Sequence, residues 1–164
     1  MTKPQHEEVI GFSGHQTLSA NTRDLVRAAI MSELSGRQGI VAVTSLAAGG
    51  DQIFAECVLT LGRKLKVVIP CNGYETTFSD PADLATYRVL LKASADTTVL
   101  PFSHPSEEAY WAAGKRIVDM ADLLIAVWDG MPAGGLGGTA DIVRYAEEQT
   151  KHVVCVWPPG ASRR

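Results

Sequence analysis

Residues 123–146 read LLIAVWDGMPAGGLGGTADIVRYA, and this stretch decides the fold class. Its apolar start, residues 123–128, is typical of a buried strand. Ile142 and Ala146 then lie one helical turn apart on the same face, as in an amphipathic helix. A glycine-rich segment, residues 129–139, connects the two. The stretch therefore predicts a strand that leads through a glycine-rich turn into a helix, which is the repeating unit of α/β folds.

The same alternation continues toward both ends of the chain. Apolar runs typical of strands alternate with amphipathic runs typical of helices. The strand-like runs are residues 9–12, 39–46, 66–70, 97–100, 123–128 and 152–157. Several are apolar on both faces, as expected when helices cover both sides of a parallel sheet. We therefore predict one α/β domain over residues 1–164, with a core of about residues 8–157. This domain is a doubly wound Rossmann-like fold of about six mostly parallel strands with helices on both faces.

Composition is that of an ordinary globular protein. The chain is 46% hydrophobic and 20% charged, which is far from the disordered regime. Residues 1–8 contain no apolar signal core, and the longest apolar run is too short to span a bilayer. Cys57, Cys71 and Cys155 have no metal-ligand spacing. We therefore expect a cytoplasmic protein with reduced thiols and no membrane partner.

The charge of the chain bears on its partners. A net charge of −3 and a pI of about 5.8 provide no general attraction to a phosphate backbone. We therefore expect that nucleic acid is not a partner. Arg163 and Arg164 lie at the end of this sequence, where we expect a frayed segment without a functional role.

Three glycine-rich turns follow the first, second and fifth predicted strands. In open parallel sheets, ligands bind outside the carboxyl ends of the strands, where helix N-termini present unpaired N–H groups to anions. Glycine lets the backbone approach such a ligand closely. The predicted ligand-binding residues are Gly11, Ser13, Gly14, His15, Ser45, Gly49, Gly50, Asp51, Asp129, Gly130, Gly135, Gly137, Gly138 and Thr139. Phosphate is the expected guest, so the turns predict a nucleotide-like ligand.

Several of these residues have a structural alternative. Asp51 follows Gly50 at a predicted helix start, where its carboxylate can cap the helix or bind ligand hydroxyls. Asp129 can accept from a ribose or a base, or serve as a turn residue. His15 has no acidic or nucleophilic neighbour in the sequence, which is also typical of a polar loop residue. Outside this set, Trp111 and Tyr110 can stack on a base, although aromatic residues at helical spacing are commonly core residues.

Three stretches of the chain resemble the SLOG superfamily. They are residues 46–52, residues 119–130, and residues 137–139 leading into residues 142–146. This superfamily is a Rossmann-like group that contains the DprA-like, YpsA-like and lonely-guy proteins. The similarity runs from Ile10 to about Val156 and is greatest to the YpsA-like branch. The resemblance implies a nucleotide-derived ligand at the glycine-rich turns and a homo-oligomer, either a dimer or larger.

The chain departs from the lonely-guy branch at the residues that carry its chemistry. That branch cleaves nucleoside monophosphates with an arginine before the fifth strand and a glutamate in a Pro-Gly-Gly-x-Gly-Thr-x-x-Glu motif. Here Ala133 replaces the proline, an extra glycine precedes Thr139, and Ile142 takes the glutamate position. The arginine position falls near Ala113. Without both groups, the charge stabilisation and acid-base chemistry needed for cleavage are missing.

We therefore predict a binding module or sensor for a nucleotide or nucleotide-derived ligand, such as AMP or an ADP-ribose-like molecule. The alternative is a phosphoribohydrolase-type enzyme that hydrolyses the N-glycosidic bond of nucleotides. Its catalytic residue is unknown, and the weak candidates are Asp51, Asp129 and Asp141. No cluster of ligands in the sequence indicates a resident metal, although Mg²⁺ can accompany bound phosphates.

Overall fold

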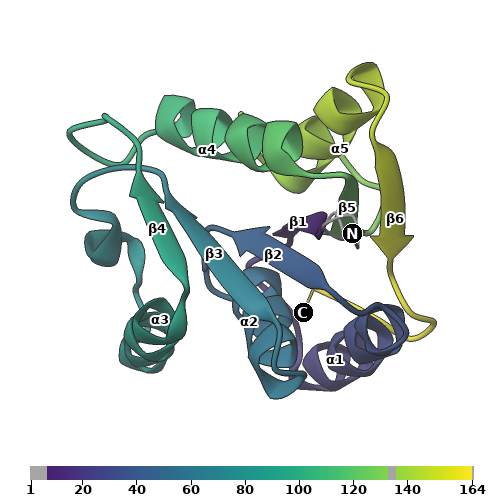
Figure 1. Cartoon of the computed structure of the whole chain (residues 1–164). Coiled ribbons are helices and arrows are strands. Elements are labelled where there is room, and N and C mark those ends of the chain that lie inside the picture. Colours follow the sequence, from purple (N-terminus) through teal and green to yellow (C-terminus); the bar gives the residue numbers. More distant parts are fainter. Residues whose placement is uncertain (1–6, 133–135, 164) are drawn as a thin grey trace.

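The computed structural model describes residues 7–132 and 136–163, and these form an α/β fold (Figure 1). The strands are β1 (Glu8–Gly14), β2 (Ile40–Thr44), β3 (Lys64–Ile69), β4 (Asp96–Val99), β5 (Leu123–Val127) and β6 (His152–Val156). The helices are α1 (Ala20–Ser35), α2 (Gly50–Thr60), α3 (Pro81–Ala93), α4 (Glu107–Met120) and α5 (Thr139–Glu148), with a short 3-10 helix η1 (Tyr74–Thr77). No helix in these ranges is both long enough and apolar enough to cross a bilayer.

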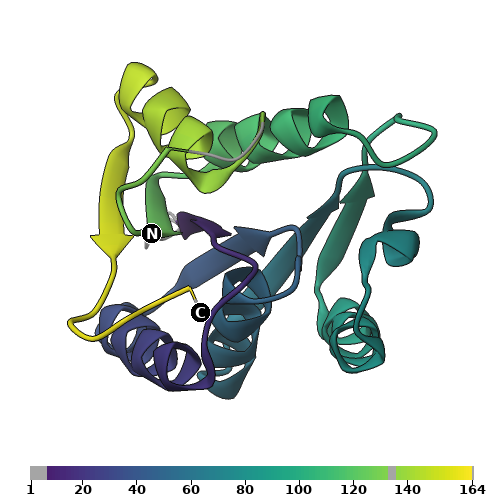
Figure 2. The same ribbon diagram turned by 180° about the vertical axis from the view of Figure 1, so that it is seen from behind.

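The six strands form one parallel sheet with the order β4-β3-β2-β1-β5-β6. β1 lies in the interior, where Gly11 pairs with Val43 of β2 and Leu124 of β5. Helices α1, α2 and α3 cover one face, and α4 and α5 cover the other (Figures 1 and 2). The predicted fold class is confirmed. The winding direction reverses between β1 and β5, and such a point is where open α/β sheets bind ligands.

Helix starts differ in how their backbone N–H groups are capped. Ser19, Asp80 and Ser106 are side-chain N-caps of α1, α3 and α4, and each accepts a backbone N–H from the first turn of its helix. Helices α2 and α5 instead begin after Gly49 and Gly138, which provide no side-chain cap. The two helices without a side-chain N-cap follow glycine-rich turns, so their N-terminal N–H groups depend on other partners.

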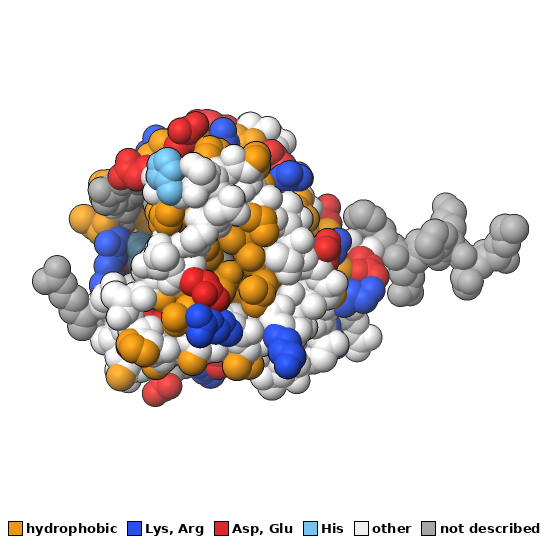
Figure 3. All heavy atoms as spheres, turned by 90° about the vertical axis from the view of Figure 1, so that its left-hand side faces the viewer, with side chains coloured by type: hydrophobic (Ala, Val, Ile, Leu, Met, Phe, Trp, Pro, Cys, Tyr) orange, Lys and Arg blue, Asp and Glu red, His pale blue; other side chains and the backbone are white. Residues whose placement is uncertain are grey.

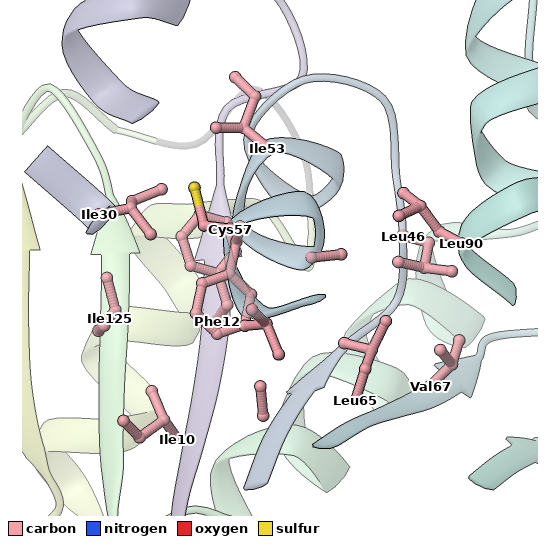
Figure 4. Close-up of a cluster of buried hydrophobic side chains, with 14 of the residues drawn as sticks. Ile10, Phe12, Ile30, Leu46, Ile53, Cys57, Leu65, Val67, Leu90 and Ile125 are labelled. Carbon is pink, nitrogen blue, oxygen red and sulfur yellow. The ribbon is translucent and has the colours of Figure 1, made fainter. Parts of the chain in front are cut away.

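The core lies mainly between the sheet and helices α1, α2 and α3. Phe12 of β1 stacks on Phe54 of α2 with ring centroids 4.5 Å apart. Ile10, Ile125 and Leu65 project from three strands into the same cluster (Figure 4). At the edge of the sheet, β4 is exposed along its whole length, which explains why residues 97–100 (TTVL) give a weaker strand signal than the more apolar runs of the inner strands. The buried inner strands fix the positions of the turns that follow them.

Candidate functional site

A cavity of about 510 Å³ lies at the carboxyl ends of the inner strands. Its polar residues come from the predicted turns and include Ser13, His15, Ser45, Asp51 and Thr139. Figure 3 views the molecule from the side of η1 and the start of α4, where the surface is hollowed and hydrophobic side chains show between polar ones. Among the described residues that line the cavity, none is a lysine or an arginine.

The structure separates the predicted site residues into two groups. Ser13, Gly14, His15, Ser45, Asp51, Gly137, Gly138 and Thr139 line the cavity. Gly11, Gly49, Gly50, Asp129, Gly130 and Asp141 do not. Gly135 lies outside the described residues. The cavity therefore brings together residues from all three glycine-rich turns, while other residues of the same turns have structural roles.

Three of the glycines outside the cavity hold secondary-structure elements together. A Cβ at Gly11 would lie 2.8 Å from Ile117 Cγ2, so this glycine allows α4 to pack closely on β1. Gly49 has a φ of +81°, and a Cβ there would overlap with the backbone carbonyl of Gln16. The N–H of Gly50 donates to the carbonyl of His15 at 3.0 Å. The turn between β2 and α2 therefore packs against the turn that follows β1.

The start of α5 is open by contrast. Gly137 has a φ of +88°, and a Cβ there would lie 2.8 Å from the backbone nitrogen of Trp111. The Ser13 hydroxyl donates to Thr139 Oγ1 at 3.3 Å, which brings β1 and α5 together at the cavity wall. Within residues 7–132 and 136–163, the N–H groups of Thr139 and Ala140 have no hydrogen-bond acceptor. This arrangement suits an anion.

Asp51 is the buried carboxyl group of the cavity. Its side chain lies in the first turn of α2, and Oδ2 accepts the Ala47 N–H at 3.1 Å. Burial raises its pKa to about 7, against the opposing effect of hydrogen bonds from Ala47, Thr44 and Ser45. Burial, and then the charge of Asp51, holds the pKa of Tyr74 well above its ordinary value. At neutral pH, Asp51 can therefore act as either a hydrogen-bond donor or an acceptor.

His15 joins the cavity to a charged pair outside it. The Asp129 N–H donates to His15 Nε2 at 3.1 Å, and Asp129 Oδ1 lies 3.2 Å from the same nitrogen. Arg163 Nη2 donates to Asp129 Oδ1 at 2.9 Å, and Arg163 Nε lies 2.7 Å from Oδ2. The expectation that Arg163 lies in a frayed segment is therefore wrong, because its guanidinium packs against a largely buried carboxylate.

The pKa values of this group follow from those contacts. Burial alone would raise the pKa of Asp129, but the Met131 N–H, the Arg163 guanidinium and His15 outweigh it and hold the pKa below its usual value. Burial lowers the pKa of His15, and the charge of Arg163 lowers it further, against the opposing effect of Asp129. At neutral pH, His15 is therefore mainly uncharged.

Apolar residues make up the part of the cavity wall that the sequence did not assign to a site. Phe78 follows η1, and Ile117 lies on α4. Tyr110 also lines the cavity, whereas Trp111 packs against Tyr145. Tyr110 was a stacking candidate in the sequence, whereas Ile117 was not assigned to any site. No local signal marked Phe78, because it lies in a short irregular connection.

The residues associated with catalysis in the lonely-guy branch have apolar replacements inside the cavity. Ala113 and Ile142 both line it and are almost fully buried. Asp141 is outside the lining, where its Oδ2 accepts the Gly137 N–H at 3.3 Å. Of the three weak catalytic candidates, only Asp51 lines the cavity. Within the described ranges, no group of three His, Cys, Asp or Glu side chains is arranged to hold a metal ion.

Solved structures share this arrangement of strands and helices. DNA processing protein A (DprA) from Streptococcus pneumoniae superposes with a TM-score of 0.70 at 18% identity, over 94% of this chain and 52% of that one. DprA from Helicobacter pylori, described as binding single-stranded DNA, gives 0.66 at 17% identity over 94% and 68%. The molybdenum cofactor binding protein from Rippkaea orientalis gives 0.61 at 16% identity over 93% and 77%. The chain therefore shares the Rossmann-like fold of these proteins, which agrees with the resemblance to the SLOG superfamily in its sequence.

The likeness to these structures corrects one expectation drawn from charge. Nucleic acid was expected not to be a partner, but a protein of this fold is described as binding single-stranded DNA. Net charge therefore does not decide this question for a chain of this fold. The chain spans about half the length of the Streptococcus pneumoniae protein. No protein-family profile and no curated protein matches the sequence. The homo-oligomer and the cytoplasmic location stay predictions.

Proposed function

We propose that the cavity binds a nucleotide or nucleotide-derived ligand, with a phosphate at the start of α5. The open helix start carries this proposal, because the N–H groups of Thr139 and Ala140 have no acceptor in the described part of the chain. The hydroxyls of Ser13 and Thr139 lie beside them, 3.3 Å apart. Hydroxyls and helix N–H groups together bind phosphate oxygens well.

The rest of the cavity suits the non-phosphate part of such a ligand. Its volume of about 510 Å³ is in the range of small-molecule sites. Tyr74, Phe78 and Tyr110 line it and provide aromatic surface for a flat ring. Asp51 provides a carboxyl group that can accept from or donate to a base edge or a ribose hydroxyl.

Binding without turnover is the form of this function that the cavity favours. Ala113 and Ile142 are aliphatic, so neither can stabilise charge or transfer a proton. Asp129 is held by Arg163, and Asp141 lies outside the lining. One observation favours a second candidate, a nucleotide hydrolase: Asp51 has a pKa of about 7, which suits general acid-base catalysis. Release of free adenine from AMP would identify this second function.

Isothermal titration calorimetry of the purified chain tests the proposal. The panel contains AMP, cyclic AMP, NAD, ADP-ribose and a short single-stranded oligonucleotide, with adenosine as a control that lacks phosphate. We expect at least one phosphate-bearing compound to bind and adenosine to bind more weakly by tenfold or more. Equal binding of AMP and adenosine would rule out a phosphate at α5, and no binding by any member would contradict the nucleotide class.

A further inference from the structure

A segment that follows β6 reaches the wall of the cavity. Residues 157–163 run back past α1 (Figure 2). The Ser162 N–H donates to Thr22 Oγ1 at 2.6 Å, and the Ser19 N–H donates to the Ser162 carbonyl at 3.3 Å. Trp157 meets the His15 ring edge to face, with centroids 5.6 Å apart. These contacts anchor the segment on the scaffold and place Arg163 beside Asp129.

His15 Nε2 makes two contacts that require opposite protonation states of this nitrogen. As an acceptor of the Asp129 N–H, at 3.1 Å, this nitrogen must carry no proton. As a donor to Asp129 Oδ1, at 3.2 Å, it must carry one. A neutral imidazole can satisfy only one of these contacts at a time. The contact that is satisfied determines which ring nitrogen carries the proton.

The contacts of Arg163 with Asp129 favour one of these two protonation states. Asp129 Oδ1 already accepts from the Met131 N–H at 3.0 Å and from Arg163 Nη2 at 2.9 Å. Oδ2 faces Arg163 Nε at 2.7 Å. Oδ1, the oxygen that faces His15, therefore already has two donors, whereas the Asp129 N–H needs an acceptor. The guanidinium charge also disfavours a second positive charge on the imidazole.

We infer that Arg163 is a positioning residue, which keeps His15 neutral with its proton on Nδ1, so that His15 acts in the cavity as an uncharged hydrogen-bond donor. Within the described residues, Nδ1 has no hydrogen-bond partner. The ligand-facing part of this inference rests on the proposed function. The protonation part concerns the protein alone.

The charged surroundings of His15 are few. Asp129 lies at the end of β5, and Arg163 lies in the segment after β6. The start of α2 contacts the His15 carbonyl through Gly50, and the titratable group there is Asp51. Asp51 is not among the groups that shift the pKa of His15. The protonation of His15 is therefore set by burial together with Arg163 and Asp129.

Long-range ¹H–¹⁵N NMR of the imidazoles tests the inference without a ligand. In the wild type, we expect His15 at pH 7.5 to be the tautomer with the proton on Nδ1, and to titrate below the other histidines. Arg163→Ala should raise the titration midpoint and move the proton toward Nε2. Arg163→Lys, which keeps the charge but not the planar fork, should restore the midpoint in part. Asp129→Asn should lower the midpoint, opposite to Arg163→Ala.

Arg27→Ala is the matched control. Arg27 has a similarly exposed side chain and an ion pair with Glu56 at 3.6 Å, away from the cavity. It should leave the His15 titration unchanged. An Nε2-protonated His15 in the wild type would overturn the inference even if no variant folds, as would identical titrations in the wild type and Arg163→Ala.

A second readout follows the pH dependence of cyclic AMP binding, because the charge of this phosphodiester is constant between pH 5 and pH 8. Arg163→Ala should bind cyclic AMP more tightly at pH 6 than at pH 8. The ratio of these two affinities should be at least threefold larger than the same ratio in the wild type. If the NMR result holds but cyclic AMP does not bind, the proposed function fails for this ligand and the protonation inference stands. If the NMR result fails, the inference falls whatever binds.

Discussion

Helices α2 and α5 both follow a buried strand and a glycine-rich turn, and both have an aspartate that reaches back to an N–H four residues earlier. Asp51 accepts from Ala47 at 3.1 Å, and Asp141 accepts from Gly137 at 3.3 Å. The surroundings of the two carboxylates differ. Asp51 is buried and lines the cavity, whereas Asp141 is half-buried and faces Arg144 outside it.

The difference shows that a glycine-rich turn does not by itself make an anion site. The N–H of Gly50 at the start of α2 is already given to the His15 carbonyl, and a buried carboxyl group stands beside it. The N–H groups of Thr139 and Ala140 at the start of α5 have no acceptor in the described part of the chain. The partner of each N–H therefore decides which helix start can receive a phosphate.

The largest expected effect comes from disrupting the packing of the turn between β2 and α2 against the turn that follows β1. Gly49→Ala places a side chain at a φ of +81°, where its Cβ overlaps with the Gln16 carbonyl. We expect the free energy of unfolding to fall by about 3 kcal/mol or more. Urea denaturation measures it. Gly36→Ala is the control, because its Cβ meets nothing within 4 Å, and it should change stability by less than about 0.5 kcal/mol. Equal effects of the two would contradict the close fit between the turns.

The next effect comes from filling the open helix start with charge. Gly138→Asp puts a carboxylate at the N-cap of α5, a position where aspartate stabilises helices. The fold should therefore persist while AMP binding falls by about 100-fold or more, about 2.7 kcal/mol, because the carboxylate repels the phosphate. Gly138→Asn has nearly the same size without the charge and should lose less than about tenfold. Equal losses in calorimetry would mean that bulk, rather than charge, excludes the ligand.

The buried carboxyl group makes stability depend on pH. The pKa of Asp51 rises from its ordinary 3.8 to about 7 on folding, so the folded chain retains a proton that the unfolded chain releases. This contribution to stability is fully present below about pH 4 and is lost as the pH rises through 7. Between pH 5 and pH 8, the loss in the free energy of unfolding is about 2 kcal/mol.

Asp51→Asn should remove this loss. The free energy of unfolding of the variant, relative to that of the wild type, should therefore rise by about 2 kcal/mol as the pH is raised from 5 to 8. Urea denaturation at the two pH values checks it, and the contribution of His15 cancels because both proteins carry it. Parallel pH profiles for the wild type and the variant would show that Asp51 ionises freely in the folded chain.

The smallest effect belongs to the aspartate outside the cavity. Asp141→Asn keeps an acceptor for the Gly137 N–H and removes a partly exposed charge near the start of α5. We expect a loss of about 0.5 kcal/mol in unfolding free energy, from the helix dipole alone. AMP affinity should stay within threefold. A loss as large as that from Gly138→Asp would place Asp141 in the site and remove the contrast between the two carboxylates.

The sequence predicted the elements of the fold well because hydrophobic periodicity is local. The run at residues 123–128 became β5, as expected. Strand order depends on pairing between distant segments, which periodicity does not encode. The weak strand signal of β4 fits its place at an exposed edge.

The site was only partly predictable for a related reason. The rule that ligands bind at carboxyl ends of strands pointed to Ser13, His15, Asp51 and Thr139, which the cavity does contain. Gly49 and Gly50 belong to the same pattern but serve packing between two turns, and this depends on tertiary contact. The pairing of Arg163 with Asp129 depends on the path of residues 157–163, for which no sequence rule exists.

Pairing β1 with β5 has a consequence for how the protein is made. Ser13 and Thr139 meet at the cavity although they are 126 residues apart in the sequence. Closing so large a loop is slow, and an N-terminal part of the chain leaves the ribosome first. The first four strands can therefore assemble before the part of the cavity wall formed by α5 exists. If the cavity binds a ligand as proposed, binding requires a chain that has been translated and folded through α5.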